Sequence, residues 1–155
     1  LVYYAGGNEN LIEKYRELLE VTAKEIIPVG NVGNATVIKV ATNLISASTV
    51  QALSESFAIA SAYGIPAESF ISAVSGNACG SALAAMKLPT MVEGDYEEHC
   101  SLDNMLKDAN IAMTLAKSAA LRTPGIEATA GVLQGLCDNG SAGLDYSALY
   151  RQFEK

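Results

Sequence analysis

The sequence predicts a mainly α protein that begins with a small β-α-β unit. Strand-forming β-branched and aromatic residues gather at residues 1–5 and 25–29, each followed by glycine. Beyond the second of these stretches the strand pattern disappears, and apolar residues recur at helical spacing. We therefore expect two parts, with residues 1–29 forming the β-α-β unit and residues 30–155 forming a helical domain.

The longest helix is expected from about residue 33 to 63, where Gly64-Ile65-Pro66 ends it. At 1.5 Å per residue it would be ~45 Å long, the length of a helix that bridges domains or subunits. A helix capped by Asn8 should reach about Ala23 and join the two strands. The remaining expected elements are, in order, helices over about 67–74 and 82–86, an irregular stretch over 89–95, a helix capped by Ser101 that ends near 122–125, a helix over about 126–138 and a helical turn over 147–153.

Composition excludes several classes of function. A net charge of −7 and a pI near 4.6 argue against a nucleic-acid partner, because such binding needs clustered lysine and arginine. The three cysteines form no C-x-x-C pair and the chain has one histidine, so we expect no metal site and a reduced, cytoplasmic protein. Lys39, Gln51 and Glu55 interrupt the most apolar stretch, so no membrane span is expected.

A lone lysine inside an apolar helical segment is the first candidate for chemistry. Lys39 and Asn43 are four residues apart, so on a helix they point the same way, within roughly 40°. The residues around them leave almost no polar face, which predicts a helix that is covered on most sides. Lys39 would then face a cleft or a partner. The alternative is that its apolar stem lies along the helix while the ammonium reaches water.

Three motifs together resemble the β-hydroxyacid dehydrogenases, which include 3-hydroxyisobutyrate dehydrogenase and 6-phosphogluconate dehydrogenase. The spacing of Gly30, Gly33, Lys39 and Asn43 is similar to the family's G-x-x-G-x-G-x-x-x-K-x-x-x-N signature, although Ala35 replaces the third glycine. Lys107-Asp108 resembles the Lys-Asp-Leu helix of the family, and residues 145–148 resemble its D-x-S-A ending. The resemblance covers nearly the whole chain in the right order.

The resemblance implies a fold, a reaction and a set of site residues. Residues 30–155 would be the all-helical C-terminal domain of the 6-phosphogluconate dehydrogenase-like type, and residues 1–29 would be the remnant of a Rossmann domain. The chain would be part of an NAD- or NADP-dependent oxidoreductase that acts on a small 3-hydroxyacid or semialdehyde. The resemblance implies that Lys39 is catalytic and that Lys107 binds the cofactor. The substrate would be bound by Asn43, Gly30 and Asn31. Asp108 would be a structural partner that pairs with a helix end or loop.

Half of such a site is missing from the sequence. The G-x-G-x-x-G turn that holds a dinucleotide is absent, and Gly30 to Ala35 does not reproduce its spacing. Two parallel strands also need neighbours, so we expect the missing strands upstream of Leu1 and expect this chain alone to be inactive. The alternative is a non-catalytic helical module of the same fold that forms dimers without a cofactor domain. In either case the long apolar helix predicts a homodimer or homotetramer.

Overall fold

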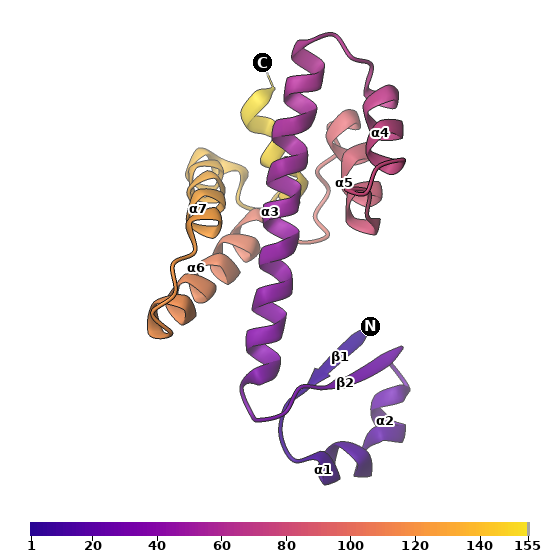
Figure 1. The fold of residues 1–155 in the computed structure, drawn as a ribbon, viewed down its shortest axis with the longest axis vertical. Helices are drawn as coiled ribbons and strands as arrows, with labels where there is room; N and C mark the ends of the chain where they lie inside the picture. The colour runs from indigo at the N-terminus through magenta and orange to yellow at the C-terminus, as the bar shows by residue number, and fades with distance from the viewer. Residues whose placement is uncertain (155) are drawn as a thin grey trace. The chain divides into compact units, whose positions relative to one another are not determined.

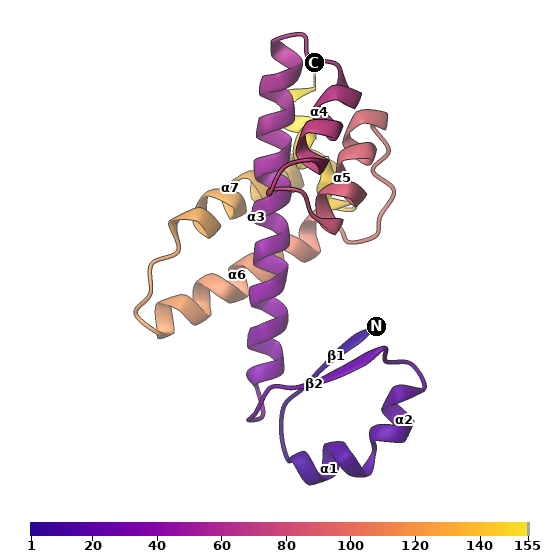
Figure 2. The same ribbon diagram turned by 45° about the vertical axis from the view of Figure 1, so that its right-hand side comes forward.

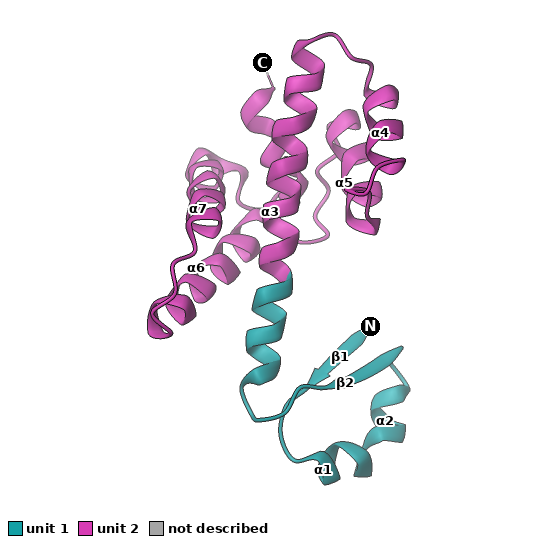
Figure 3. Cartoon of the chain, viewed as in Figure 1, with its two compact units in different colours: residues 1–42 teal, residues 43–155 magenta. Residues whose placement is uncertain are grey.

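In the computed structural model, which describes residues 1–154, contacts divide the chain between Thr42 and Asn43 (Figure 3). The division falls inside the long helix α3 (Asn34–Ala62), the helix expected over about 33–63. Unit 1 is residues 1–42, and unit 2 begins at Asn43. The domain boundary expected after residue 29 therefore stays a prediction. The mainly α fold class is confirmed, since helices make up most of the chain and the sheet has two strands.

Unit 1 is a parallel β-α-β unit followed by the start of α3. Strands β1 (Val2–Ala5) and β2 (Glu25–Pro28) pair in register, with Val2 opposite Glu25 and Ala5 opposite Pro28. The Asn8 side chain caps the first helix by accepting from the N–H groups of Asn10 and Leu11, as expected.

The single helix expected from Asn8 to about Ala23 is wrong. The structure has two short helices, α1 (Glu9–Lys14) and α2 (Arg16–Glu20), separated at Tyr15, whose φ of −108° and ψ of 11° are not helical. Neither helix has a buried residue, so no packed apolar face holds the two in one axis.

Unit 2 is a set of helices packed around the second part of α3. Its further elements are α4 (Ala67–Ser75), α5 (Ala82–Glu93), α6 (Leu102–Ser118), α7 (Pro124–Leu136), the π-turn η1 (Cys137–Ser141) and the 3-10 helix η2 (Tyr146–Phe153). Figures 1 and 2 show α4 and α5 on one side of this part of α3, and α6 and α7 on the other.

The core of unit 2 combines buried apolar side chains of α3, α4, α5, α6, α7 and η2. Its most buried members are Val50 of α3, Leu88 of α5, Leu102 of α6, Leu133 of α7 and Leu149 of η2. Phe57 of α3 stacks between Phe70 and Tyr150, with ring centroids at 5.4 and 4.9 Å, which ties α4 and η2 to α3. Among residues 1–154 no helix combines the length and apolar character that crossing a membrane requires.

The irregular stretch expected over residues 89–95 is also wrong. Helix α5 continues through Pro89 to Glu93 and ends at Gly94, whose φ is 67°. A proline inside a helix removes one backbone hydrogen bond. The burial of Leu88 and Met91 on either side of Pro89 offsets that loss, since each is at most 2% exposed.

Candidate functional site

The first candidate residues lie where both strands of unit 1 end. The carboxyl ends of parallel strands share one edge of a sheet, which is where open α/β sheets bind ligands. The N–H of Gly7, after β1, donates to the carbonyl oxygen of Gly30, after β2, at 2.7 Å. A Cβ on Gly6 would lie 2.6 Å from the oxygen of Asn31, so only glycine fits there. The structure thus brings the exposed Gly30 and Asn31 beside the Gly6-Gly7 turn.

Lys39 lies one turn before Asn43 on α3, as the helical spacing predicted. Lys39 is exposed and belongs to unit 1, whereas Asn43 is half-buried and belongs to unit 2. The helix is not covered on most sides, because Val37 is 48% and Ile45 is 68% exposed. That expectation is therefore wrong for the chain by itself.

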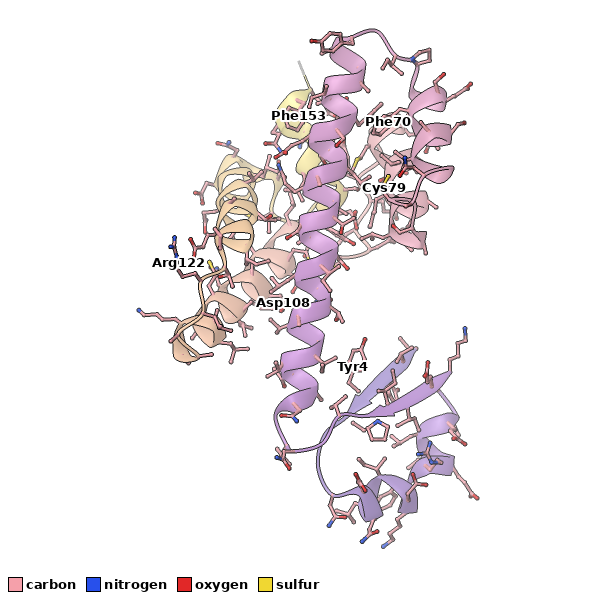
Figure 4. All side chains as sticks on the ribbon, viewed as in Figure 1. Tyr4, Phe70, Cys79, Asp108, Arg122 and Phe153 are labelled. Atoms are coloured by element: carbon pink, nitrogen blue, oxygen red, sulfur yellow. The ribbon has the colours of Figure 1, made fainter. Side chains whose placement is uncertain are left out.

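Asn43 is joined to α6 by a hydrogen bond between side chains. Its Nδ2 donates to Oδ2 of Asp108 at 2.6 Å, and Asp108 is 3% exposed. Figure 4 labels Asp108 on α6 where that helix passes α3. We expected Asp108 to pair with a helix end or loop, whereas this hydrogen bond joins it to a side chain within α3. Positions 105, 108, 109 and 112 form the buried face of α6, which turns the carboxylate toward α3.

Lys107 lies on the exposed face of α6. Its Nζ donates to Oδ1 of Asn104 at 3.0 Å and is 3.7 Å from Oδ1 of Asp108. A groove of about 530 Å³ runs along this face. Its walls combine the Lys107 ammonium with the amide of Asn110, the hydroxyl of Thr114 and the apolar side chains of Ile111 and Leu115.

A second ion pair, which the sequence analysis missed, lies deep in unit 2. Nζ of Lys87 on α5 contacts both carboxylate oxygens of Asp145, at 2.8 and 2.9 Å, and both side chains are 2% exposed. Asp145 also accepts from the N–H groups of His99, Cys100 and Ser147. The carboxylate therefore fixes the backbone just before α6 begins.

The surroundings of this ion pair shift the pKa values of two side chains, Asp145 and Tyr146. Burial raises the pKa of Asp145, but hydrogen bonds from Lys87, Ser147 and the Cys100 N–H outweigh it and hold that pKa below its usual value. Tyr146 places its ring 4.4 Å from Nζ of Lys87, a cation–π contact. Burial, together with the Asp145 charge, raises the pKa of Tyr146 to about 12.

One signal in the sequence points to this pair. Lys87 interrupts an apolar run, residues 82–91, in a segment that we expected to leave helix after Met86. Extending that helix by one turn would have placed Lys87 between the buried Ala84 and Leu88. A charge in that position requires an opposite charge nearby.

Comparison with known proteins identifies a family. The family model described as NAD-binding of NADP-dependent 3-hydroxyisobutyrate dehydrogenase matches residues 33–153. This confirms the resemblance that the motif spacing indicated.

Similar proteins cover nearly the whole chain. It is 29% identical to 2-hydroxy-3-oxopropionate reductase of Escherichia coli (strain K12), with 96% of this chain and 51% of that protein aligned. It is 27% identical to glyoxylate/succinic semialdehyde reductase 2, chloroplastic, of Arabidopsis thaliana, over 96% of this chain and 42% of that protein. The solved structure of a 3-hydroxyisobutyrate dehydrogenase from Mycobacterium tuberculosis with L-serine superposes with a TM-score of 0.87 at 25% identity, over 97% of this chain and 54% of that one. The chain thus spans about half the length of the relatives it matches.

Proposed function

Because this chain belongs to the NADP-dependent 3-hydroxyisobutyrate dehydrogenase family, we propose that it forms part of an NAD(P)-dependent oxidoreductase. The enzyme transfers a hydride between the nicotinamide cofactor and a small 3-hydroxyacid or semialdehyde. The observation that carries the proposal is the family match over residues 33–153, which contains Lys39, Asn43 and Lys107-Asp108 at the motif positions. In this proposal residues 30–155 are the helical C-terminal domain of the 6-phosphogluconate dehydrogenase-like type, and residues 1–29 are the last β-α-β of a Rossmann domain.

The residues of this chain fit only part of the cofactor. The groove on α6 offers Lys107 to a phosphate or ribose oxygen, and Ile111 and Leu115 to an apolar ring. The turn after β1 lies against residue 31, since a Cβ on Gly6 would be 2.6 Å from the Asn31 carbonyl oxygen, and the chain has no G-x-G-x-x-G turn to hold a pyrophosphate. We therefore assign Lys107 to one end of NAD or NADP and expect 155 residues alone to bind NADPH weakly and to show no activity.

In the proposed reaction this chain provides the residue that exchanges a proton with the substrate. The bound nicotinamide accepts or supplies the hydride, and Lys39 exchanges the hydroxyl proton with the substrate, an acid–base contribution of typically ~10² to 10⁴-fold. Lys39 is an exposed residue of α3. Asn43, one turn along α3, contacts the substrate through its amide without adding charge. Gly30 and Asn31 contribute backbone groups that bind the substrate from the end of β2.

The test is steady-state kinetics of the whole protein on a panel of small hydroxyacids and semialdehydes. Lys39→Met keeps the length and apolar stem of the side chain while removing the ammonium, so folding should survive. We expect kcat to fall by ~10² to 10⁴ with little change in cofactor KM. Asn43→Ala should lower kcat less than Lys39→Met does, since Asn43 exchanges no proton with the substrate in this scheme. Lys117→Met removes an exposed lysine from the last turn of α6 and is the matched control.

The alternative is a non-catalytic module that keeps this fold and forms dimers. It predicts that the wild-type protein turns over none of the panel, or that Lys39→Met retains near-normal kcat on the best substrate. Calorimetry on the 155-residue chain gives an independent check. Micromolar affinity for NADPH in that chain would show that the cofactor site has been misplaced.

A further inference from the structure

The orientation of the Asn43 amide is fixed by its contact with α6. A carboxylate accepts hydrogen bonds and an amide nitrogen donates them. The 2.6 Å contact with Asp108 Oδ2 therefore requires the nitrogen of Asn43 to face α6 and its carbonyl oxygen to point the other way. The amide cannot reverse without placing its oxygen against the Asp108 carboxylate.

The burial of Asp108 makes this orientation stable. Asp108 is 3% exposed and lies on the same face of α6 as the buried Met105, Ala109 and Ala112. A hydrogen bond to an ionised acceptor is roughly twice as strong as a neutral one. The side chain of Asn43 is therefore held in place before any ligand arrives.

We propose that Asp108 is a positioning residue that selects which atom of Asn43 meets the substrate. This inference rests on the proposed function. With its nitrogen turned to Asp108, Asn43 presents Oδ1 and accepts a hydrogen bond, so it recognises the substrate hydroxyl. The substrate carboxylate is an acceptor and would meet an acceptor at Asn43, so it is held by other groups. The Asn43 amide could by itself either donate or accept a hydrogen bond. Asp108 thereby makes Asn43 an acceptor, which selects a hydroxyl donor.

The first test observes the amide directly and does not depend on activity. In the purified protein, the side-chain NH₂ signals of Asn43 should be shifted and unequal in an NMR amide spectrum, because one proton is bonded to a charge. Asp108→Leu removes the acceptor at similar volume and should bring the two protons toward solvent-exposed values. Asp108→Asn can still accept through its own oxygen and should retain most of the inequality. Unchanged Asn43 signals in Asp108→Leu would overturn the proposal.

The second test is a double-mutant cycle in the whole enzyme. We expect Asp108→Leu to lower kcat/KM by about 10- to 100-fold, the usual effect of removing a group that orients a ligand, and Asp108→Asn to restore part of it. If Asp108 acts through Asn43, its substitution should have little further effect in the Asn43→Ala background. Full additivity would contradict the inference. The control is Asp138→Asn, which removes the same charge from an exposed position in η1, away from the α6 groove.

The two proposals fail in different ways. A wild-type enzyme with no turnover on any hydroxyacid or semialdehyde would refute the proposed function, while the NMR experiment would still decide whether Asp108 orients Asn43. An active enzyme with additive Asp108 and Asn43 effects would preserve the function and refute the positioning role.

Discussion

At the residue scale, Lys87 and Asp145 form an ion pair in which both charged side chains are buried, each only 2% exposed. Removing one partner of such a pair leaves an uncompensated buried charge, which costs about 3–5 kcal/mol. We therefore expect Asp145→Asn to lower the free energy of unfolding by an amount in that range. Urea denaturation measures it. Asp138→Asn, at an exposed site bonded to Gln134, is the matched control and should change stability by under about 0.5 kcal/mol.

The same carboxylate gives a prediction about pH. The folded-state pKa of Asp145 lies below the ordinary aspartate value of 3.8. A group with a depressed pKa stabilises the fold above its unfolded pKa, and this contribution is lost as the pH falls through the folded pKa. Unfolding free energies measured from pH 6 downward should therefore fall more steeply below about pH 4 in the wild type than in Asp145→Asn. Parallel curves would show that Asp145 is not charged and paired in the folded state.

Side-chain partners distant in sequence were the least predictable feature of the site. The positions of Lys39 and Asn43 on one helix face followed from local spacing, and the structure bears this out. The partner of Asn43 is 65 residues away and that of Lys87 is 58 residues away. Helical periodicity shows which residues are buried, but it does not say which element covers them. The sequence therefore predicted a structural role for Asp108 but not its hydrogen bond with Asn43.

At the element scale, the end of α6 contains a residue in an unfavourable conformation. Ala120 has a φ of 55°, the left-handed region that glycine occupies at no steric cost. The N–H of Leu121 donates to Ala116 and that of Ala120 to Lys117, which is the Schellman arrangement usually built with glycine. We expect Ala120→Gly to stabilise the protein by about 0.5–1 kcal/mol, since the strain relieved exceeds the added freedom of the unfolded chain.

Thermal and urea unfolding of Ala120→Gly would measure this gain. Ala119→Gly is the matched control, because Ala119 has a φ of −93° and gains nothing from glycine there. It should be neutral or destabilising. Equal effects from both substitutions would contradict the argument from left-handed geometry.

Element boundaries were predicted well where caps and turns have clear residue types. The helix starts expected after Asn8 and at residue 82 are confirmed, where the side chains of Asn8 and Ser81 accept from backbone N–H groups. The errors arose where packing opposed local propensity. We expected the helix to end at Met86 and an irregular stretch to begin at Pro89, but buried neighbours keep α5 continuous to Glu93. Conversely, the periodic segment from residue 9 to 20 breaks at Tyr15, since it buries none of its residues.

At the scale of the whole molecule, unit 2 leaves an apolar stripe of α3 uncovered. The stripe consists of exposed residues that recur every three, four or seven positions and so lie on one face: Ile45, Ala52, Ser56, Ile59 and Tyr63. Ile59 is 62% and Tyr63 is 85% exposed. A groove of about 610 Å³ borders the stripe and is lined by small residues of α3 together with Phe70 and Cys79.

An uncovered face of this kind favours association of identical chains. The stripe itself carries no charge, whereas the chain as a whole has a net charge of −7, so this face opposes self-association less than the rest of the surface does. A two-fold arrangement places the same stripe of both copies in one interface, with the small residues allowing close approach of the helices. We expect sedimentation equilibrium at tens of micromolar to show a dimer or a larger oligomer built from dimers.

Ile59→Glu tests whether the stripe is the interface. A carboxylate within the stripe would lose its hydration on association, so the variant should be monomeric under the same conditions. Leu121→Glu introduces the same charge at a residue that is 64% exposed in the α6–α7 connection, and it should remain associated. Because both positions are exposed in the single chain, neither substitution should lower its folding stability by more than about 0.5 kcal/mol. A wild-type monomer, or an Ile59→Glu variant as associated as the wild type, would show that another surface or none is used.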